Sequence, residues 1–535
     1  MQSYPIRTFK VSTTTSSFQG APSAHSRNKH GKLKSVCQYI KKYCDETSLH
    51  GFKYLSESDR PFYERVYWII AIFTAFLIVG YVIKDQVEHF LKSPVLISFE
   101  SKQTPVEKIP FPAVTLCPDM QLRTSMLNLS EAINNNNMTQ KELEKFYFAL
   151  KICNIISSKV VNISFTRELV HDMIDSINGN ESCESMVHSM EWEKNMYDNP
   201  CDYLQPTITS YGACFTFNML PLDQILRRTE ENWSSERYFG KEPIWTPDEG
   251  FLKKKSTGYN FSSPWAIKRS TLPIGVALFF LKLSSTGFDE TCGFGGYGFF
   301  GYVHNPAELP GQAHPTIYAE ANRTLLVQLQ PKMYTINHRL RRWNAKERGC
   351  YFDTERYLML FNIYTQRNCE LECEANFSIA HCNCMAFYHP YVENISICGP
   401  TSYQCHQSNK DKAKVCDCLP SCSELQYDIV TLSINRNWPD KRLQYKKDND
   451  PNMSHTMIKV QYESRYVQGI TRDVMFGLSD FVANVGGLLG LFLGFSILSL
   501  VEVIYFLTVR ICTKLWRDHV DRGRERQGNW NDLVL

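Results

Sequence analysis

Residues Val66 to Ile83 read VYWIIAIFTAFLIVGYVI, an apolar run without a charged side chain. An α-helix of this length covers roughly 27 Å at 1.5 Å per residue, close to the hydrocarbon thickness of a bilayer. A second apolar run, Phe481 to Val509, lies near the other end of the chain and contains only a few polar side chains. The two runs predict membrane-spanning helices over residues 66–84 and 479–509.

Basic residues flank the two runs on their outer sides. Seven Lys or Arg residues lie in 32–65, and six lie in 510–526. The positive-inside rule therefore places the 1–65 and 510–535 tails in the cytosol and residues 85–478 outside the cell. The first 65 residues are polar and include a Ser/Thr-rich stretch, so we expect no cleavable signal peptide. Length and a net charge of +3 by themselves exclude neither a soluble nor a membrane protein.

The distribution of glycosylation sequons tests this topology. Ten Asn-x-Ser/Thr sequons lie between the two runs and none lies in either tail. They begin at Asn128, Asn137, Asn162, Asn180, Asn232, Asn260, Asn322, Asn376, Asn394 and Asn452. Sixteen of the 19 cysteines also lie between the runs, whereas Cys37, Cys44 and Cys512 do not. An even number of cysteines in an oxidising compartment predicts disulfide bonds.

Ten of these cysteines form a dense module over residues 350–422. They are Cys350, Cys369, Cys373, Cys382, Cys384, Cys398, Cys405, Cys416, Cys418 and Cys422. In a cytosolic protein, the Cys-x-Cys pairs with His381 and His406 nearby would suggest zinc. Sequons at Asn376 and Asn394 lie inside the module, so disulfides are favoured and no metal site is predicted.

The segment between the two runs has mixed secondary-structure patterns. Ser93–Pro118 is extended and rich in proline, and Gln140–Ile152 has helical spacing. Gly212–Asn218 and Ile274–Leu283 have the composition of strands. The predicted fold is a membrane protein with two transmembrane helices flanking a large, disulfide-rich α+β extracellular domain.

Several segments resemble the degenerin and epithelial sodium channel superfamily, which includes the acid-sensing ion channels, with the insect pickpocket branch most similar. In chain order they are His50-Gly51, Phe111-Pro-Ala-Val-Thr-Leu-Cys117-Pro118, Gly212-Ala-Cys214-Phe-Thr-Phe-Asn218, Asn368-Cys-Glu-Leu-Glu-Cys373, and Gly490-Leu-Phe-Leu-Gly-Phe-Ser-Ile-Leu-Ser-Leu-Val-Glu502. The resemblance extends from about residue 50 to 506. The last segment is the most specific of the five.

The resemblance implies an exterior of palm, finger, thumb, knuckle and β-ball subdomains on a trimeric, amiloride-sensitive-type sodium channel. The trimer would contain identical or related subunits in the plasma membrane, in contact with lipid and without nucleic acid. Thumb disulfides of the family are nested, which would pair Cys350–Cys422, Cys369–Cys418, Cys373–Cys416, Cys382–Cys405 and Cys384–Cys398. The only small species implied is permeant Na⁺, with no cofactor.

The same resemblance assigns roles to residues of the second run. Gly494, Phe495 and Ser496 correspond to the selectivity filter, where backbone and hydroxyl oxygens replace part of the ion's hydration shell. His50, Gly51 and Ala483 correspond to gating positions. A small side chain at Ala483 would allow the outer helices to close.

Physical chemistry limits where the polar residues of the second run can face, and the family pattern is the main reason to favour a pore over a hydrogen-bond patch. A charged side chain inside a membrane helix costs at least about 2.5 kcal/mol, so Glu502 is expected to face protein or water. Ser496, Ser499 and Glu502 recur every three residues on one helix face, which would line either a wet path or an interhelical hydrogen-bond patch. Gly486, Gly490 and Gly494 would permit close backbone approach.

The sequence departs from the acid-sensing and epithelial members at two positions. Phe495 replaces a small Ala or Ser in the filter, and Tyr505 stands where acid-sensing channels carry an Asp. Attraction of cations would then depend on Glu502, together with Asp480 at the outer mouth and Ser499 in the pore.

Other protein classes agree less well with the sequence. ATP-gated trimeric channels share two spans and a cysteine-rich exterior but lack the Gly490–Glu502 pattern. A nonconducting auxiliary subunit or cell-surface receptor of the same fold is the alternative that Phe495 keeps open. The chain contains no Gly-x-Ser-x-Gly, His-Glu-x-x-His or P-loop motif, so an enzyme is not expected. Epithelial sodium and fluid transport and sensory transduction are both compatible roles, and the stimulus has no signature.

Overall fold

A computed structural model describes residues 38–92, 95–134, 137–153, 155, 163–178, 180–197, 199–227, 245–247, 250–251, 266–284, 286–289, 291–292, 296–311, 313–390, 392–410, 416–435, 452–475, 477–517 and 519–520. The chain divides into two compact units. One contains Pro94–Val474, and the other combines Met1–Ser93 with Met475–Leu535. Each unit is described by itself.

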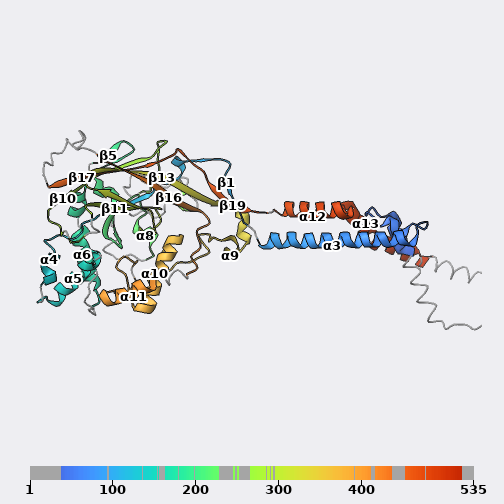
Figure 1. The fold of residues 1–535 in the computed structure, drawn as a ribbon, viewed down its shortest axis with the longest axis horizontal. Helices are drawn as coiled ribbons and strands as arrows, with labels where there is room; N and C mark the ends of the chain where they lie inside the picture. The colour runs from blue at the N-terminus through green and yellow to red at the C-terminus, as the bar shows by residue number, and fades with distance from the viewer. Residues whose placement is uncertain are drawn as a thin grey trace, which may run out of the picture. The chain divides into compact units, whose positions relative to one another are not determined.

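Two β-sheets form the centre of the Pro94–Val474 unit (Figure 1). The larger sheet has the order β1-β19-β13-β17-β10-β4-β5, with β16 also paired to β13. Its strands are β1 Val95–Phe99, β19 Ile470–Val474, β13 Arg323–Ile336, β17 Met453–Tyr462, β10 Val276–Ser284, β4 Val187–Trp192, β5 Asn195–Tyr197 and β16 Glu424–Asn435. The smaller sheet has the order β12-β11-β3-β7-β6, with strands β12 Thr316–Glu320, β11 Gly298–His304, β3 Ala113–Pro118, β7 Gly212–Phe217 and β6 Leu204–Thr209.

The core of this unit lies between the two sheets. Phe279 of β10 and Val460 of β17 belong to one buried cluster with Leu116 of β3 and Phe217 of β7. All four side chains are fully buried. Alternate residues of a strand point to opposite faces, so one face of each sheet supplies this apolar layer. Burial of these large side chains from both sheets is the main stabilising contribution to their packing.

Helices form two further groups in the same unit. The first contains α4 Leu129–Asn134, α5 Gln140–Ile152 and α6 Arg167–Asn178, which pack around a second buried cluster, and α7 Asn180–Met186, whose Cys183 and Met186 join the cluster between the sheets. The second consists of α10 Gln366–Cys382 and α11 Pro400–Lys410, which lie side by side. The start of α5 is fixed by a capping box, in which the side chain of Thr139 accepts from the backbone of Glu142 and Glu142 bonds back to Thr139.

Several short elements complete the fold. They are α8 Leu222–Ile225, α9 Ala345–Arg348, β2 Thr104–Pro105, β18 Tyr466–Val467, β8 Trp245–Thr246, β9 Gly250–Phe251, β14 Cys384–Met385 and β15 Ser396–Ile397. Three 3-10 turns cover Val106–Lys108, Pro200–Tyr203 and His338–Arg342.

Eight disulfides use all sixteen cysteines of this unit. Five are the nested pairs Cys350–Cys422, Cys369–Cys418, Cys373–Cys416, Cys382–Cys405 and Cys384–Cys398. The pairing implied by the family resemblance is therefore confirmed. Cys117–Cys214, Cys153–Cys292 and Cys183–Cys201 are additional pairs that were not predicted from the sequence. Cys44 and Cys512 are free thiols, and Cys37 lies outside the described residues.

The predicted elements of this unit are largely confirmed. Helix α5 has the predicted bounds, and β7 and β10 lie within or close to the predicted strands. The predicted extended stretch contains β1, β2 and β3. The sequons at Asn137, Asn322, Asn376, Asn394 and Asn452 are exposed, and Asn128 is half-buried. Asn180 begins α7, whereas Asn162, Asn232 and Asn260 lie outside the described residues.

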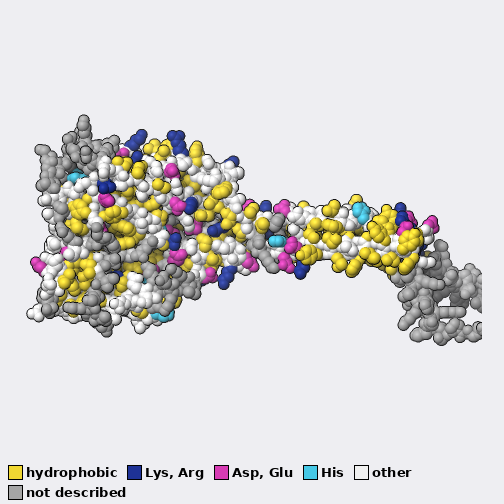
Figure 2. Space-filling view, viewed as in Figure 1, with side chains coloured by type: hydrophobic (Ala, Val, Ile, Leu, Met, Phe, Trp, Pro, Cys, Tyr) yellow, Lys and Arg dark blue, Asp and Glu magenta, His cyan; other side chains and the backbone are white. Residues whose placement is uncertain are grey.

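The second unit is helical. It contains a helix over 38–46, the short helix α2 Lys53–Ser56, the long helix α3 Phe62–Lys92, and two helices from the second apolar run, α12 Leu478–Leu493 and α13 Ile497–Leu507. Helices α3 and α12 pack side by side. Large apolar side chains such as Phe73, Phe76 and Leu77 are exposed on α3, and hydrophobic side chains dominate the surface of these helices (Figure 2).

The second apolar run differs from the prediction because it is not one continuous helix. Within the described residues, Phe62–His89 is the one helix long and apolar enough to cross a membrane alone. The pair formed by Leu478–Leu493 and Ile497–Arg517 reaches that length only together and is bent by 72° at the break. The expected single helix over 479–509 is therefore corrected to two helices, and the layout with two spans remains a prediction.

Candidate functional site

The break between α12 and α13 is made by the three residues predicted as the filter. Gly494 ends α12 in the left-handed conformation, with φ of +65°, which glycine adopts without the steric cost that a Cβ atom brings. Ser496 begins α13 as its N-cap, and its side-chain oxygen accepts a 3.2 Å hydrogen bond from the Ser499 N–H. The residue that ends α12, Gly494, and the residue that caps α13, Ser496, are thus two positions apart, with Phe495 between them.

A turn from the N-terminal segment occupies the break. The His50 N–H donates a 3.1 Å hydrogen bond to the carbonyl of Leu493, the last residue of α12. A Cβ atom on Gly494 would lie 2.7 Å from Cγ, Cδ2 and Nε2 of the His50 ring. The space beside Gly494 is therefore filled by His50.

Gly51, the next residue of this turn, packs against α3. Its φ is +86°, and a Cβ atom there would lie 3.1 Å from Cγ1 of Ile72. A side chain at this position would meet both an unfavourable backbone conformation and the packed surface of α3. His50 and Gly51 thus join α3 to the broken end of α12.

The polar stripe of α13 is bonded to the same N-terminal segment. Ser48 shares a 2.9 Å hydrogen bond with the Ser499 hydroxyl and donates from its own hydroxyl, also at 2.9 Å, to Oε2 of Glu502. The Ser48 N–H is 3.3 Å from the same carboxylate oxygen. Ser499 is 1% exposed, so in one subunit these positions form the hydrogen-bond patch that was the alternative to an open wet face.

Contacts continue past Glu502 toward the end of the second apolar run. The ring of Tyr43 packs edge-on against Phe506 with ring centroids 5.0 Å apart, and the Tyr39 hydroxyl donates to the Phe506 carbonyl. Arg510 forms a two-pronged ion pair with Glu46, at 2.5 and 3.2 Å. From Glu46 through Ser48 to His50, the partners move back along the chain from Arg510 through Glu502 and Ser499 to Leu493, so this part of the N-terminal segment runs antiparallel to the second half of the broken helix.

The sequence was compared with known protein families. Residues 43–506 match the family model described as amiloride-sensitive sodium channel. The chain belongs to the amiloride-sensitive sodium channel family.

Relatives of this sodium channel family cover most of the chain. Pickpocket protein 28 of Drosophila melanogaster is 27% identical over 507 residues, which is 89% of this chain and 78% of the relative. Sodium channel protein Nach of the same fly is 22% identical, covering 87% of this chain and 86% of the relative. Acid-sensing ion channel 1C of Danio rerio is 20% identical, covering 92% and 88%. Members of the amiloride-sensitive sodium channel family are plasma membrane cation channels rather than enzymes, and the disulfide-rich unit is the family's extracellular domain.

Other residues predicted from the sodium channel family resemblance lie on exposed surface of α12. Ala483 is exposed, and Asp480 is exposed at the first turn, where its carboxylate accepts a 3.0 Å bond from the Gly477 N–H. Among described atoms, none comes within 4 Å of a Cβ built on Gly486, and Gly490 meets only the Phe495 carbonyl, at 3.8 Å. Gly486 and Gly490 therefore do not approach α3 closely within one chain, and the close approach predicted for them remains a prediction.

The residues around the His50-Gly51 turn that contact the second apolar run were not identified from the sequence. Ser48, Glu46 and Tyr43 had no assigned role, and Arg510 was read only as a topology signal. Their partners lie more than 450 residues away in the chain. The sequence contains one weak indication of these contacts. Glu46, shortly before the His-Gly pair, and Arg510, just after the second apolar run, have opposite charges.

In the extracellular domain, the cysteine-rich module contacts β19. The Arg472 guanidinium donates a 3.3 Å hydrogen bond to the carbonyl of Ser421, which adjoins the Cys350–Cys422 disulfide. Burial raises the pKa of the Glu424 carboxyl, and nearby Arg472 partly opposes that rise. Strand β19 pairs antiparallel with β1, from Val95 opposite Val474 to Phe99 opposite Ile470. These two strands are the ones next in sequence to α12 and α3.

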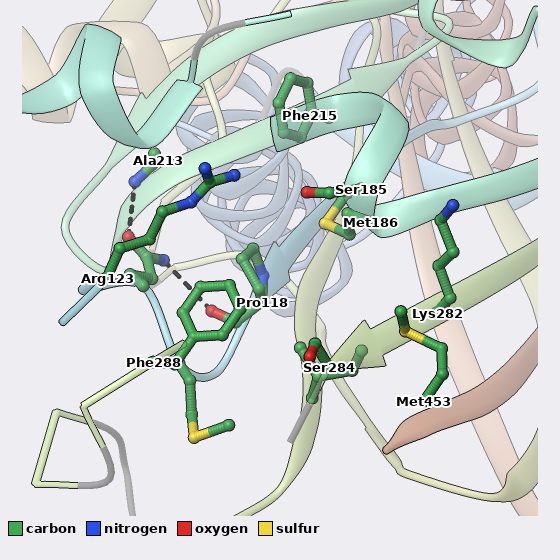
Figure 3. Close-up of a pocket in the computed structure, with 13 residues that line it drawn as sticks. Pro118, Arg123, Ser185, Met186, Ala213, Phe215, Lys282, Ser284, Phe288 and Met453 are labelled. Carbon is green, nitrogen blue, oxygen red and sulfur yellow. Dashed lines mark hydrogen bonds between the residues drawn. The ribbon is translucent and has the colours of Figure 1, made fainter. Parts of the chain in front are cut away.

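The extracellular domain of this sodium channel family member also contains a cavity of about 160 Å³ (Figure 3). Arg123 and Lys282 lie on opposite sides of it, with Met186, Phe288 and Met453 among its apolar lining. The Gln121 side chain closes one edge, accepting from the Ala213 N–H at 2.8 Å and donating to the Pro118 carbonyl at 3.3 Å. None of the predicted site residues lines this cavity.

Proposed function

We propose that the chain is one subunit of a trimeric sodium channel of the plasma membrane, gated through its extracellular domain. In this proposal α3 is the first span, and α12 with α13 forms the second, broken span. The observation that carries the proposal is the break at Gly494, Phe495 and Ser496, held in place by the His50-Gly51 turn.

A break in a membrane helix supports a filter for a physical reason. Helix ends leave backbone carbonyls without intrahelical partners, and such oxygens can replace water around a cation. Inside a bilayer, irregular backbone is tolerated only where it is buried in protein or lines a water-filled cavity. Because one subunit supplies only one such break, several subunits around an axis are needed to form a ring.

Two features of the broken helix support association around that axis. The α12 face that carries Asp480, Ala483 and Gly487 is exposed, and no described atom lies within 4 Å of a Cβ on Gly487. Small residues on such a face allow close helix approach in membranes. Asp480 at the start of α12 adds negative charge that would attract cations.

Glu502 supports a cation path on the inner side of the break. Its Oε2 atom is bonded to Ser48, whereas Oε1 is buried without a hydrogen-bond partner among the described residues. A buried carboxylate oxygen is costly unless it is paired. In the proposed trimer, this oxygen would face water, a permeant Na⁺ or a neighbouring subunit.

The proposed topology has both termini in the cytosol. Basic tails on both outer sides support it through the positive-inside rule, and the disulfides and sequons of residues 94–474 support an extracellular location. The N-terminal segment 38–51 and α13 would then meet at the cytosolic half of the channel.

The decisive experiment is expression of the chain alone and with related subunits in oocytes, with surface protein quantified by biotinylation. We expect an amiloride-sensitive current that is larger in sodium than in potassium. The matched variant Phe495→Ser restores a small filter residue and is expected to keep or increase the preference for sodium.

Absence of current in every combination, with normal surface protein, would contradict the channel proposal. It would favour a nonconducting auxiliary subunit or receptor, the alternative suggested by the bulky Phe495. A current without preference for sodium would retain the channel and reject selective sodium transport.

A further inference from the structure

We propose that Glu374, His389 and His406 form a binding site for Zn²⁺ in the cysteine-rich module of the extracellular domain. These three residues are the group among the described residues whose donor atoms are placed to hold a metal ion. They come from α10, the loop after β14, and α11.

The distances between the donor atoms fit a zinc site. Oε1 of Glu374 lies 3.3 Å from Nε2 of His406 and 3.5 Å from Nε2 of His389. All three donor atoms lie within 4.8 Å of one another. Zinc bonds to imidazole nitrogen and carboxylate oxygen are about 2.0–2.2 Å long in tetrahedral sites, which places ligand atoms about 3.3–3.5 Å apart. The distances from Oε1 of Glu374 to Nε2 of His406 and of His389 therefore already match those around a bound zinc ion.

The three side chains are buried, so water does not compete strongly with a metal ion for their donor atoms. The side chain of His389 is 0% exposed, that of His406 is 1% and that of Glu374 is 15%. Two imidazoles and one carboxylate supply one negative charge, which suits a divalent cation and leaves one tetrahedral position open. Imidazole ligands favour zinc over calcium or magnesium, which prefer oxygen.

Tyr388 contacts two of the three ligands. Its hydroxyl lies 2.9 Å from Oε1 of Glu374 and 3.2 Å from Nε2 of His406. The hydroxyl donates its hydrogen bond to the Glu374 carboxylate. This hydrogen bond fixes the orientation of Glu374, as outer partners do for metal-binding carboxylates.

Disulfides position the three ligands before any ion arrives. Glu374 follows Cys373, which is bonded to Cys416, and His406 follows Cys405, which is bonded to Cys382. His389 lies five residues after Cys384, which is bonded to Cys398. The cysteines themselves are consumed as disulfides, so this site differs from the thiolate zinc site that the sequence pattern suggested as an alternative. Its ligands are one glutamate and two histidines of the disulfide-bonded module.

Two hydrogen bonds must be given up when the ion binds. The contact between the Tyr388 hydroxyl and Nε2 of His406 is replaced by the bond from that nitrogen to zinc. The Ala386 N–H donates to Nδ1 of His389 at 3.3 Å, whereas zinc at Nε2 leaves the proton on Nδ1. This long bond would be lost, so we expect micromolar rather than tighter binding.

The experiment uses the full-length glycoprotein purified in detergent, stripped with a chelator and titrated with Co²⁺ as an optical probe and then with Zn²⁺. Wild type is expected to develop the visible absorption of four-coordinate Co²⁺, to lose it when Zn²⁺ competes, and to bind one more zinc per chain than the variants. Glu374→Gln and His406→Ala are expected to weaken zinc binding at least tenfold. His381→Ala, at an exposed histidine on the same helix, is the matched control and should bind as wild type does.

Because the readout is binding, it does not depend on current, and a failure of the channel proposal would not affect it. Each variant is first checked for a single peak in size-exclusion chromatography, and Glu374→Gln, which preserves side-chain shape, provides the result if His406→Ala fails to fold. Equal zinc stoichiometry and affinity in wild type and Glu374→Gln would overturn the proposal. Loss of binding in His381→Ala as well would overturn it too, because it would indicate a different site.

Discussion

The imidazole ring of His50 occupies the space that a side chain on Gly494 would need. A Cβ atom at position 494 would lie 2.7 Å from three atoms of that ring, and Gly494 has a φ of +65°. Glycine is therefore needed at the helix break for two separate reasons, the packing of the His50 ring and the left-handed backbone.

We expect Gly494→Ala to displace His50 and to reduce the surface-normalised current at least tenfold. The left-handed backbone adds a cost of about 1 kcal/mol for a residue with a Cβ atom. Gly80→Ala, in α3, is the control, because no described atom lies within 4 Å of a Cβ built there. Adding His50→Ala to Gly494→Ala should restore part of the current by relieving the clash. No rescue, together with a normal current in Gly494→Ala alone, would refute the steric coupling.

We expect Ser48→Ala to destabilise the protein by about 1–2 kcal/mol, because it removes hydrogen bonds to a carboxylate and to a buried hydroxyl. The measurement is the midpoint of thermal denaturation in detergent. Ser58→Ala, at an exposed position of the same tail, is the control. In a double-mutant cycle, the effects of Ser48→Ala and Ser499→Ala should be less than additive. Strict additivity would mean that the two hydroxyls do not interact.

We expect Ala483→Val to increase resting current severalfold while leaving expression unchanged. Ala483 is exposed in one subunit, so the added methyl groups would act on contacts between subunits rather than on the fold. Val482→Ile adds a methyl group at a neighbouring exposed position and should have little effect. Unchanged resting current in surface-expressed Ala483→Val would count against a gate at this position.

We expect replacement of both Cys350 and Cys422 by Ser to change the rate or extent of gating in the channels that reach the surface. This disulfide closes a segment with a sequence separation of 72, and its loss is expected to cost about 4 kcal/mol and lower the surface yield. Its neighbour Ser421 contacts Arg472 of β19, which gives the gating effect a route. The control is the Cys384/Cys398 double Ser variant in the same module. Identical gating in both variants and wild type would reject a lever role for Cys350–Cys422.

We expect Asn376→Gln to increase electrophoretic mobility by one glycan, because Asn376 is exposed on α10. Enzymatic deglycosylation should remove the difference from wild type. If neither this variant nor the corresponding changes at Asn394 and Asn452 alters the mobility, residues 94–474 would not be extracellular.

Local signals explain what could be predicted from the sequence. Helix α5 has the predicted bounds because its periodicity and the Thr139–Glu142 capping box both act within a few residues. The nested pairs from Cys350–Cys422 inward followed from the family resemblance, since spacing alone allows many connectivities. The other three disulfides join residues 18 to 139 apart in the sequence and had no pattern to identify them.

The broken helix shows why the candidate site was predicted only in part. Gly494 and Ser496 were identified as filter residues, but glycine and serine are also tolerated inside continuous membrane helices, so their presence did not indicate a break. The break is also contacted by His50, whose partners Leu493 and Gly494 are more than 440 positions away. No periodicity or spacing rule relates residues at that separation.

The contacts between residues 39–50 and the segment 493–510 can form only late in synthesis of the chain. Ribosomes release the N-terminal segment long before its partners exist, because nearly the whole chain separates the two. Until residues 493–510 have been made, Ser48, Glu46 and His50 lack these native partners, whereas Ile72, which packs against Gly51, is made early. Completion of these contacts is therefore among the last events of subunit folding, and a cell could use the exposed N-terminal segment to recognise subunits that are not yet complete.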